Sequence, residues 1–401
     1  MAGAAGRDPE GGLVVLGAGY AGLTVAREVA RRSHGSLPVL LIDRNPVHVL
    51  RTELYEIGKM ADSAGDARHW TVPLARVLDR TGVSFRQGTV ASIDPSSQRV
   101  RLDGGGEVPF RYLVICLGSV AAYYGVPGAA ESTFSVYRLS GAQRLAARVR
   151  DVERDSATLP GERRPRFVIV GGGSTGTELA AEIATVDWTR LAGPGARPPD
   201  VVLLTGALPF LVGLPPKLVA HARTILRKAG VALIHGVNVV RVEPGRVYLE
   251  DGSVLACDAA VWCAGLEAPP VVKSVPGPHG KGGRIAVAPT LDIPGHPNIF
   301  AVGDVVEIRD PSTGMLVPAT AQAALAEARV AAANLVARAE GRPLEPFRYR
   351  ERGVVVALGL GKAAGTLGRL TIWGSPAALL KRVVEREYSR ATERGQESSL
   401  L

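Results

Sequence analysis

The sequence predicts an α/β protein that contains one strand–turn–helix unit twice. The first copy, LVVLGAGYAGLTVAREVA, begins at Leu13, and the second, FVIVGGGSTGTELAAEIA, begins at Phe167. In each copy an apolar run predicts a buried strand, glycines follow in the spacing GxGxxG, and apolar residues then recur with helical periodicity. Glycine makes up 48 of the 401 residues, which is typical of a chain with many tight turns.

The glycines of each copy have separate physical roles at a dinucleotide. The first allows a tight turn, the second lets a pyrophosphate approach the backbone, and the third lets the helix pack on the strand. The helix N-terminus adds unpaired N–H groups and a partial positive charge. These positions are filled by Gly17, Gly19 and Gly22 in the first copy and by Gly171, Gly173 and Gly176 in the second. Both copies therefore predict dinucleotide sites.

The two copies differ where the next strand ends. The apolar run 39–42 ends in Asp43, whose carboxylate can accept hydrogen bonds from a ribose. The corresponding run 201–204 is followed by Thr205 and Gly206, with no acidic residue. Because no carboxylate would repel a 2'-phosphate there, we expect the second site either to accept NADPH as well as NADH or to be a weak, degenerate site.

A third pattern lies later in the chain. The apolar run 299–302 ends in Gly303 and Asp304, and Pro318 to Gln322 opens an alanine-rich helix that reaches about Ala339. Two shorter apolar runs, at 113–117 and 260–264, end in Gly118 and Gly265. These patterns predict additional strands, and they place an acidic residue at the end of one of them.

With these motifs the chain resembles the two-dinucleotide-binding-domain flavoproteins and, among them, the type II NADH dehydrogenases, which are FAD enzymes that reduce quinones. The resemblance is carried by GAGYAGL, LYEIG, YYGVPGA, VGGGSTGTELAAEI and AVGDVVEI. It implies an FAD domain at 1–125 and 288–345, an NAD(P)H domain at 126–287 inserted into it, and a C-terminal region at 346–401. It also implies hydride transfer from NAD(P)H to the flavin, followed by passage of two electrons to a quinone-like acceptor.

The resemblance assigns roles to individual residues. The expected FAD contacts are Gly17, Ala18, Gly19, Tyr20, Ala21, Asp43, Arg44, Gly118 and Asp304. The expected NAD(P)H contacts are Gly171, Gly173, Ser174, Thr175, Gly176 and Glu178. Further cofactor contacts are expected at Gly22, Val90, Thr205, Gly265, Ala321 and Gln322. Glu178 and Gln322 are the candidate catalytic residues, with an ordinary exposed helix glutamate as the alternative for Glu178.

Two departures from the family pattern keep other functions open. The family's helix start carries a second glutamine four residues after the first, and this chain has Ala326 there, beside Glu327. The segment Arg51-Thr52-Glu53 is more polar than its family counterparts. The alternatives are a soluble FAD-dependent oxidase or dehydrogenase of a small organic molecule, and a redox-sensing flavoprotein of the apoptosis-inducing-factor type.

The spacing of the cysteines argues against a redox-active disulfide, and the spacing of the histidines argues against a metal site. Cys116, Cys257 and Cys263 form no CxxC pair, so we expect reduced, packing cysteines in an intracellular protein. The histidines lack metal-ligand spacing, and we expect no metal site.

The C-terminal region predicts a basic amphipathic helix over 376–390. Leu380, Val384 and Tyr388 form a stripe that Leu379 and Val383 adjoin, flanked by arginines and a lysine. This helix either lies on a membrane surface or packs against the protein, including in a homodimer. No secretory signal and no spanning segment are apparent, so we expect a cytoplasmic protein, peripheral on the membrane at most. The net charge is +9, but we expect no nucleic-acid partner.

Overall fold

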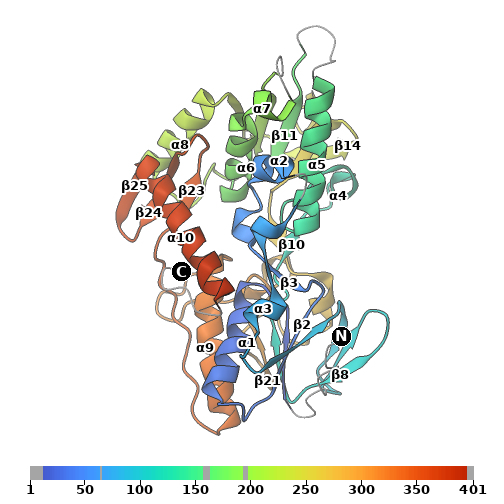
Figure 1. The fold of residues 1–401 in the computed structure, drawn as a ribbon, viewed down its shortest axis with the longest axis vertical. Coiled ribbons are helices and arrows are strands. Elements are labelled where there is room, and N and C mark those ends of the chain that lie inside the picture. The colour runs from blue at the N-terminus through green and yellow to red at the C-terminus, as the bar shows by residue number, and fades with distance from the viewer. Residues whose placement is uncertain (1–11, 64–65, 157–162, 193–196, 395–401) are drawn as a thin grey trace.

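The computed structural model describes residues 12–63, 66–156, 163–192 and 197–394. Residues 1–11, for which we expect no secretory signal, lie outside this part of the chain. The described residues build two parallel sheets, one above the other in Figure 1, and a C-terminal element that runs along both.

The first sheet has six strands in the order β20-β21-β9-β1-β2-β5, all parallel except β20. Their bounds are β1 Leu13–Leu16, β2 Val39–Asp43, β5 Val83–Gln87, β9 Tyr112–Ile115, β20 Asp292–Ile293 and β21 His296–Ala301. Helices α1 (Tyr20–Arg32) and α9 (Ala321–Ala339) pack side by side at this sheet (Figure 1). Two distant parts of the chain therefore share one sheet.

The second sheet has four parallel strands in the order β13-β12-β11-β17. They are β11 Arg166–Val170, β12 Asp200–Thr205, β13 Val231–His235 and β17 Ala259–Trp262. Helices α5 (Leu139–Ser156), α6 (Ser174–Thr185) and α8 (Pro216–Lys228) belong to this unit. The central strands are continuous apolar runs because such sheets are buried on both faces. The predicted α/β fold class with two Rossmann-like units is confirmed.

The segment after β3 (Val47–Val49) crosses from the first unit to the second. Leu54, Ile57, Met60 and Trp70 are buried in the core that contains β11 and α6. Helix α2 (Ile57–Asp62) presents this apolar side to α5. Part of the predicted FAD range 1–125 therefore packs on helices α5 and α6 of the second unit, a contact that the order of elements along the chain did not indicate.

Smaller elements complete the two units. A three-stranded antiparallel sheet accompanies each one, β6-β7-β8 in the first and β14-β15-β16 in the second, and β10 pairs with β18 at the junction. The bounds are η1 Arg51–Glu53, η2 Arg68–Trp70, β4 Thr71–Pro73, α3 Leu74–Val77, β6 Val90–Asp94, β7 Arg99–Leu102, β8 Glu107–Pro109, β10 Val120–Ala121, α4 Ala129–Ser132, α7 Trp188–Ala192, β14 Val239–Glu243, β15 Arg246–Leu249, β16 Val254–Ala256, β18 Leu266–Glu267, η3 Pro270–Ser274, η4 Lys281–Gly283, β19 Ile285–Ala286 and β22 Val306–Glu307.

The C-terminal element is an antiparallel sheet followed by a helix. The sheet comprises β23 Val355–Ala357, β24 Ala363–Leu367 and β25 Leu370–Gly374, and α10 spans Ser375–Glu393. Helix α10 packs on the protein through Ala377, Ala378, Tyr388 and Ala391. Tyr388, which periodicity places on one stripe with Leu380 and Val384, is buried, whereas Leu379 and Val383 remain exposed. Among the described residues, no helix has the length and apolarity that crossing a bilayer requires.

Candidate active site

The first glycine-rich turn has the geometry that a dinucleotide needs. Gly17 has a φ of +99°, and a Cβ there would lie 2.4 Å from the carbonyl oxygen of Cys116. A Cβ at Gly22 would lie 1.8 Å from the carbonyl oxygen of Gly17, so helix and turn touch. Gly19 lies directly before α1, and a Cβ added there would have no neighbouring heavy atom within 4 Å. The turn is closed on its inner side and open at Gly19, where a pyrophosphate would fit.

Two polar side chains, half-buried Asp43 and buried His48, hold this turn in place. Asp43 accepts hydrogen bonds from the backbone N–H of Ala18 at 2.7 Å and from that of Asn45 at 2.8 Å. His48 Nδ1 lies 2.8 Å from the carbonyl oxygen of Ala18, and burial lowers the pKa of His48. Neutral His48 therefore donates from Nδ1, and its Nε2 accepts from the Tyr388 hydroxyl at 3.1 Å. Helix α10 is thus linked to the turn through His48.

The predicted residues Gly118 and Asp304 meet at the carboxyl end of the first sheet. The Ser119 hydroxyl donates to Asp304 at 2.9 Å, and Arg51 lies 3.8 Å from the same carboxylate. A Cβ at Gly118 would lie 2.8 Å from Arg51 Nη1. In the sequence, Arg51 is only an unusually polar residue, and no pattern indicates a role for Ser119.

A buried glutamate supports the backbone beside Asp304. Glu327 accepts from the N–H of Gly303 at 2.6 Å, and burial raises the pKa of Glu327 to about 8. Helix α9 begins nearby, with Thr320 accepting from the N–H of Ala323 at 3.2 Å. The remaining predicted FAD contacts lie at the ends of elements: Tyr20 and Ala21 begin α1, Arg44 follows β2, Val90 begins β6, and Ala321 and Gln322 begin α9.

The second glycine-rich turn repeats the backbone geometry of the first. Gly171 has a φ of +117°, and a Cβ there would lie 2.4 Å from the backbone of Cys263. A Cβ at Gly176 would lie 2.0 Å from the carbonyl oxygen of Gly171, whereas Gly173 faces open space. Ser174 and Thr175 form the first turn of α6. A Cβ at Gly265 would lie 2.0 Å from the Tyr124 hydroxyl oxygen.

Thr205 occupies the position that Asp43 has in the first unit. The N–H of Gly17 donates to Ile42 and that of Gly171 to Leu204, the residues just before Asp43 and Thr205. Thr205 is buried, and its hydroxyl lies 2.6 Å from His235 Nδ1. The second turn therefore lacks a carboxylate at this position, and the hydroxyl found there already has a partner.

Glu178 is buried and paired, which rules out an exposed helix glutamate. Its carboxylate lies 3.0 Å from Lys381 Nζ and accepts from the N–H of Ala357 at 3.0 Å. Lys381 also lies 2.9 Å from Glu385 and above the Tyr55 ring. Glu178 thus joins α6 to α10 and β23, and the sequence offered no signal for Lys381 as its partner.

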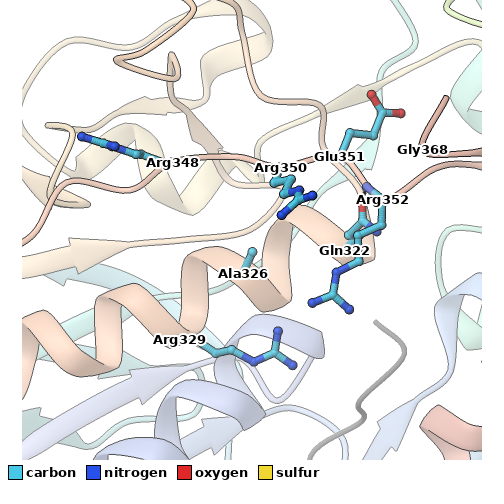
Figure 2. A pocket seen from close by; sticks show the side chains of 8 residues that line it. All are labelled: Gln322, Ala326, Arg329, Arg348, Arg350, Glu351, Arg352 and Gly368. Carbon is cyan, nitrogen blue, oxygen red and sulfur yellow. Dashed lines mark hydrogen bonds between the residues drawn. The ribbon is translucent and has the colours of Figure 1, made fainter.

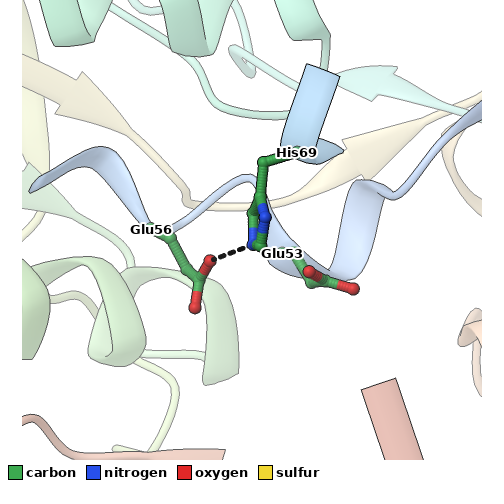
Figure 3. A group of neighbouring side chains, drawn as sticks. All are labelled: Glu53, Glu56 and His69. Atoms are coloured by element: carbon green, nitrogen blue, oxygen red, sulfur yellow. Dashed lines mark ion pairs between the residues drawn. The ribbon is translucent and has the colours of Figure 1, made fainter. Parts of the chain in front are cut away.

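A second cluster of ionisable side chains, drawn in Figure 3, lies near Lys381 and Glu385, whose charges act on Glu53. Glu53, Glu56 and His69 bring ligand atoms within 4.8 Å of one another, which histidine spacing did not indicate. His69 Nε2 lies 3.8 Å from Glu56, which also pairs with Lys59. Burial and the charges of Glu385 and Glu56 raise the pKa of Glu53 to about 8.

A hollow of about 410 Å³ lies where α9 begins (Figure 2). Gln322 is one of its lining residues, and its side-chain oxygen accepts from the Tyr349 hydroxyl at 3.2 Å and from the N–H of Arg352 at 3.1 Å. Ala326, at the position of the family's second glutamine, also lines it. The two departures noted in the sequence thus border structural features, the hollow at Ala326 and the carboxylate cluster at Glu53.

Two open glycine-rich turns, one on each of two Rossmann-like sheets, are the geometry of a protein with two dinucleotide sites. The family model described as pyridine nucleotide-disulphide oxidoreductase matches residues 12–328, and the chain belongs to this family. The cysteines Cys116, Cys257 and Cys263 are all free.

Individual relatives narrow the class. The demethylphylloquinone reductase NdbB of Synechocystis sp. is 29% identical over 385 residues, covering 93% of this chain and 90% of that protein. The type II NADH:quinone oxidoreductase of Staphylococcus aureus is 29% identical over 384 residues, covering 93% and 94%. A structure of NDH2 from Plasmodium falciparum in complex with NADH has the same fold, with a TM-score of 0.81 at 14% identity, covering 97% and 96%. The resemblance to type II NADH dehydrogenases is confirmed.

Proposed function

We propose that this chain is an FAD-dependent enzyme that takes hydride from NADH or NADPH and passes two electrons to a quinone. The observation that carries the proposal is the pair of glycine-rich turns, each closed by backbone contacts and open at Gly19 or Gly173. Relatives named as quinone oxidoreductases align with more than nine-tenths of the chain, which supports the choice of acceptor.

The first site fits FAD. The open backbone at Gly19 would receive the pyrophosphate, and Asp43 has lone pairs left for ribose hydroxyls. Asp304 and Gly118 would hold the other end of the molecule. Bound FAD would supply the chemistry of accepting a hydride and releasing electrons. The N-terminus of α9, with its partial positive charge, would stabilise negative charge on the reduced flavin.

The second site fits a nicotinamide nucleotide, with the pyrophosphate at Gly173 and the N-terminus of α6. We propose Glu178 and Gln322 as catalytic residues, because they lie on the helices that follow the second glycine-rich turn and Asp304. The ion pair with Lys381 and the hydrogen bond from the N–H of Ala357 hold the Glu178 side chain in one orientation.

We further propose that the enzyme binds a membrane surface peripherally, on the cytoplasmic side. Exposed apolar side chains gather on the β24–β25 hairpin and the outer side of α10, namely Leu367, Leu370, Trp373, Leu379 and Val383. Arg369, Arg382, Arg386 and Arg390 are interspersed with them. Apolar side chains flanked by basic ones suit an anionic membrane surface.

Vesicle flotation tests the membrane proposal. Replacing Leu370 and Trp373 by glutamate should abolish flotation with anionic vesicles, whereas Val240→Glu, a change at an exposed valine on β14, should not. Unchanged flotation would place the contact elsewhere. Concentration-dependent self-association that the same double substitution abolishes would identify a homodimer interface instead.

Flavin spectroscopy tests the redox proposal. Anaerobic NADH should bleach the bound flavin, and a quinone should then restore its absorbance within the turnover time. Restoration only by oxygen would identify an oxidase, and restoration by neither would favour the redox-sensing alternative.

A further inference from the structure

The hollow beside α9 has a polar, basic lining. One wall is a single face of α9, formed by Gln322, Ala326 and Arg329. The opposite wall comes from the segment between α9 and β23 and from the turn between β24 and β25, and it contributes Arg348, Arg350, Glu351, Arg352 and Gly368. Only Ala326 and Gly368 among these residues lack a polar or charged side chain. A ligand of the hollow would therefore meet charged groups as well as the aliphatic stems of the arginines.

The charge of the lining is strongly one-sided. Four arginines face one glutamate, and Figure 2 shows the guanidinium groups of Arg329, Arg350 and Arg352 gathered close to Gln322. The carboxylate of Glu351 points away from them in the same view. Guanidinium groups bind carboxylates with paired hydrogen bonds, so this lining suits a ligand that carries a carboxylate.

The hollow begins at Gln322, which we propose as a catalytic residue. Gln322 lies in the first turn of α9, and its side chain is fixed by the hydroxyl of Tyr349 and the backbone of Arg352. Ala326 and Arg329 follow about one and two turns later on the same helix face, so the wall extends roughly 10 Å beyond Gln322. Because the guanidinium groups of Arg329, Arg350 and Arg352 gather close to Gln322, a short acidic substituent on a molecule that contacts Gln322 would lie among them.

We propose that the acceptor is an acidic quinone, whose carboxylate binds Arg329, Arg350 and Arg352 while its ring lies at Gln322. This inference rests on the proposed function and specifies its substrate. The reaction consumes NAD(P)H, one proton and the quinone and yields NAD(P)⁺ and the hydroquinone, and the carboxylate is unchanged. Ala326 leaves room for the ring where a second glutamine side chain would otherwise project.

A matched pair of synthetic quinones isolates the charge. We would compare 2-methyl-1,4-naphthoquinone carrying a 3-carboxyethyl arm with its methyl ester, because the arm is insulated from the ring and the two reduction potentials are nearly equal. The holoenzyme should show a kcat/KM at least tenfold higher for the acid, mainly through KM, or about 1.4 kcal/mol. Equal values for the two quinones would overturn the inference.

The variant Arg350→Gln/Arg352→Gln links the preference to the hollow. The backbone N–H of Arg352 still reaches Gln322 in this variant, so the wall should keep its shape. We expect the acid-to-ester ratio to fall to near one. The control is Arg99→Gln/Arg101→Gln, which removes the same charge from two exposed arginines on β7 and should keep the ratio. A similar fall in the control would mean that overall charge, not the hollow, sets the preference.

A binding measurement without turnover separates the two proposals. Calorimetric titration of the acid into oxidised holoenzyme should show binding that weakens at least tenfold in the Arg350→Gln/Arg352→Gln variant. If NADH bleaches the flavin but neither quinone reoxidises it, the proposed function is wrong. If both quinones are reduced but the acid binds no better than the ester, only the acidic-acceptor inference is wrong. Competition by phosphatidylglycerol vesicles, and not by free glycerophosphate, would assign the arginines to a lipid headgroup and overturn it.

Discussion

The two glycine-rich turns have the same backbone conformation and differ in the side chains that surround them. Gly17 and Gly171 both have positive φ values, and both press against the backbone where the neighbouring strand ends. In the first unit Asp43 accepts from the turn's own N–H group at Ala18. In the second unit Thr205 stands at this position and bonds to His235 instead.

This difference separates the formation of a turn from the choice of its ligand. The turn depends on steric demands within a few residues, so the same glycine spacing produces it twice. Ligand preference depends on one residue at the end of the adjacent strand, where the two units have a carboxylate and a hydroxyl. The two units can therefore bind different dinucleotides with the same motif.

The largest expected effect comes from the third glycine of each turn. Gly22→Ala and Gly176→Ala would each place a Cβ within about 2 Å of a backbone carbonyl oxygen, which cannot move aside as a flexible side chain could. Gly22→Ala should yield mostly flavin-free protein. Gly176→Ala should keep its flavin and raise KM for NADH more than tenfold. Flavin absorbance and steady-state kinetics check this, and loss of flavin in both variants would show that the units do not fold independently.

Substitutions at Asp43 and Thr205 should change the ligand binding of the first and the second site, respectively. Asp43→Ala removes a charged hydrogen-bond acceptor worth about 1.5–3 kcal/mol, and FAD affinity should fall roughly ten- to a hundredfold.

Wild-type kcat/KM values for NADH and NADPH should lie within about tenfold of each other, or about 1.4 kcal/mol. Thr205→Asp should favour NADH, because the new carboxylate accepts ribose hydroxyls and repels a 2'-phosphate. A wild-type preference of about a thousandfold for NADH would contradict the role given to Thr205.

The buried carboxylate beside Asp304 predicts a pH dependence of stability. The pKa of Glu327 is raised to about 8 in the folded protein, so the folded state binds a proton more tightly than the unfolded chain does. The contribution of protonated Glu327 to the free energy of unfolding is fully present below the pKa of glutamate in the unfolded chain, and it is lost as the pH rises through about 8. The Tm should therefore fall between pH 6 and pH 9, and it should fall less in Glu327→Gln. If the wild type and Glu327→Gln showed the same dependence of Tm on pH, Glu327 would be ionised in the folded protein at neutral pH.

The smallest expected effect concerns the link between α10 and the first turn. Tyr388→Phe removes the hydroxyl that donates to His48 but keeps the packed ring. We expect a loss of about 1 kcal/mol in the free energy of unfolding, with FAD retained. Denaturant unfolding measures this, and the control Tyr124→Phe, at an exposed tyrosine, should change stability less. Release of FAD by Tyr388→Phe would show that the link also controls the cofactor.

The sequence by itself determined the two turns, the strands before them and the acidic or hydroxyl residue that follows. These features depend on short-range rules: glycine alone tolerates the positive φ of the turn, and strands buried on both faces must be apolar. Gly118 and Asp304 could be placed through the family resemblance, which implies that the strand before Asp304 returns to the first domain. Helix α10 was predicted, and the structure extends it by a few residues.

Only the tertiary structure decided which side chains from distant segments meet. Lys381 pairs with Glu178, Arg51 lies near Asp304, and Arg350 faces α9, although no local pattern connects the members of these pairs. Periodicity defined an apolar stripe on α10 but could not say that Tyr388 would turn inward while Leu379 stays exposed. A helix repeats every 3.6 residues whatever lies beside it, so the neighbours that cover each face are set by how the whole chain packs.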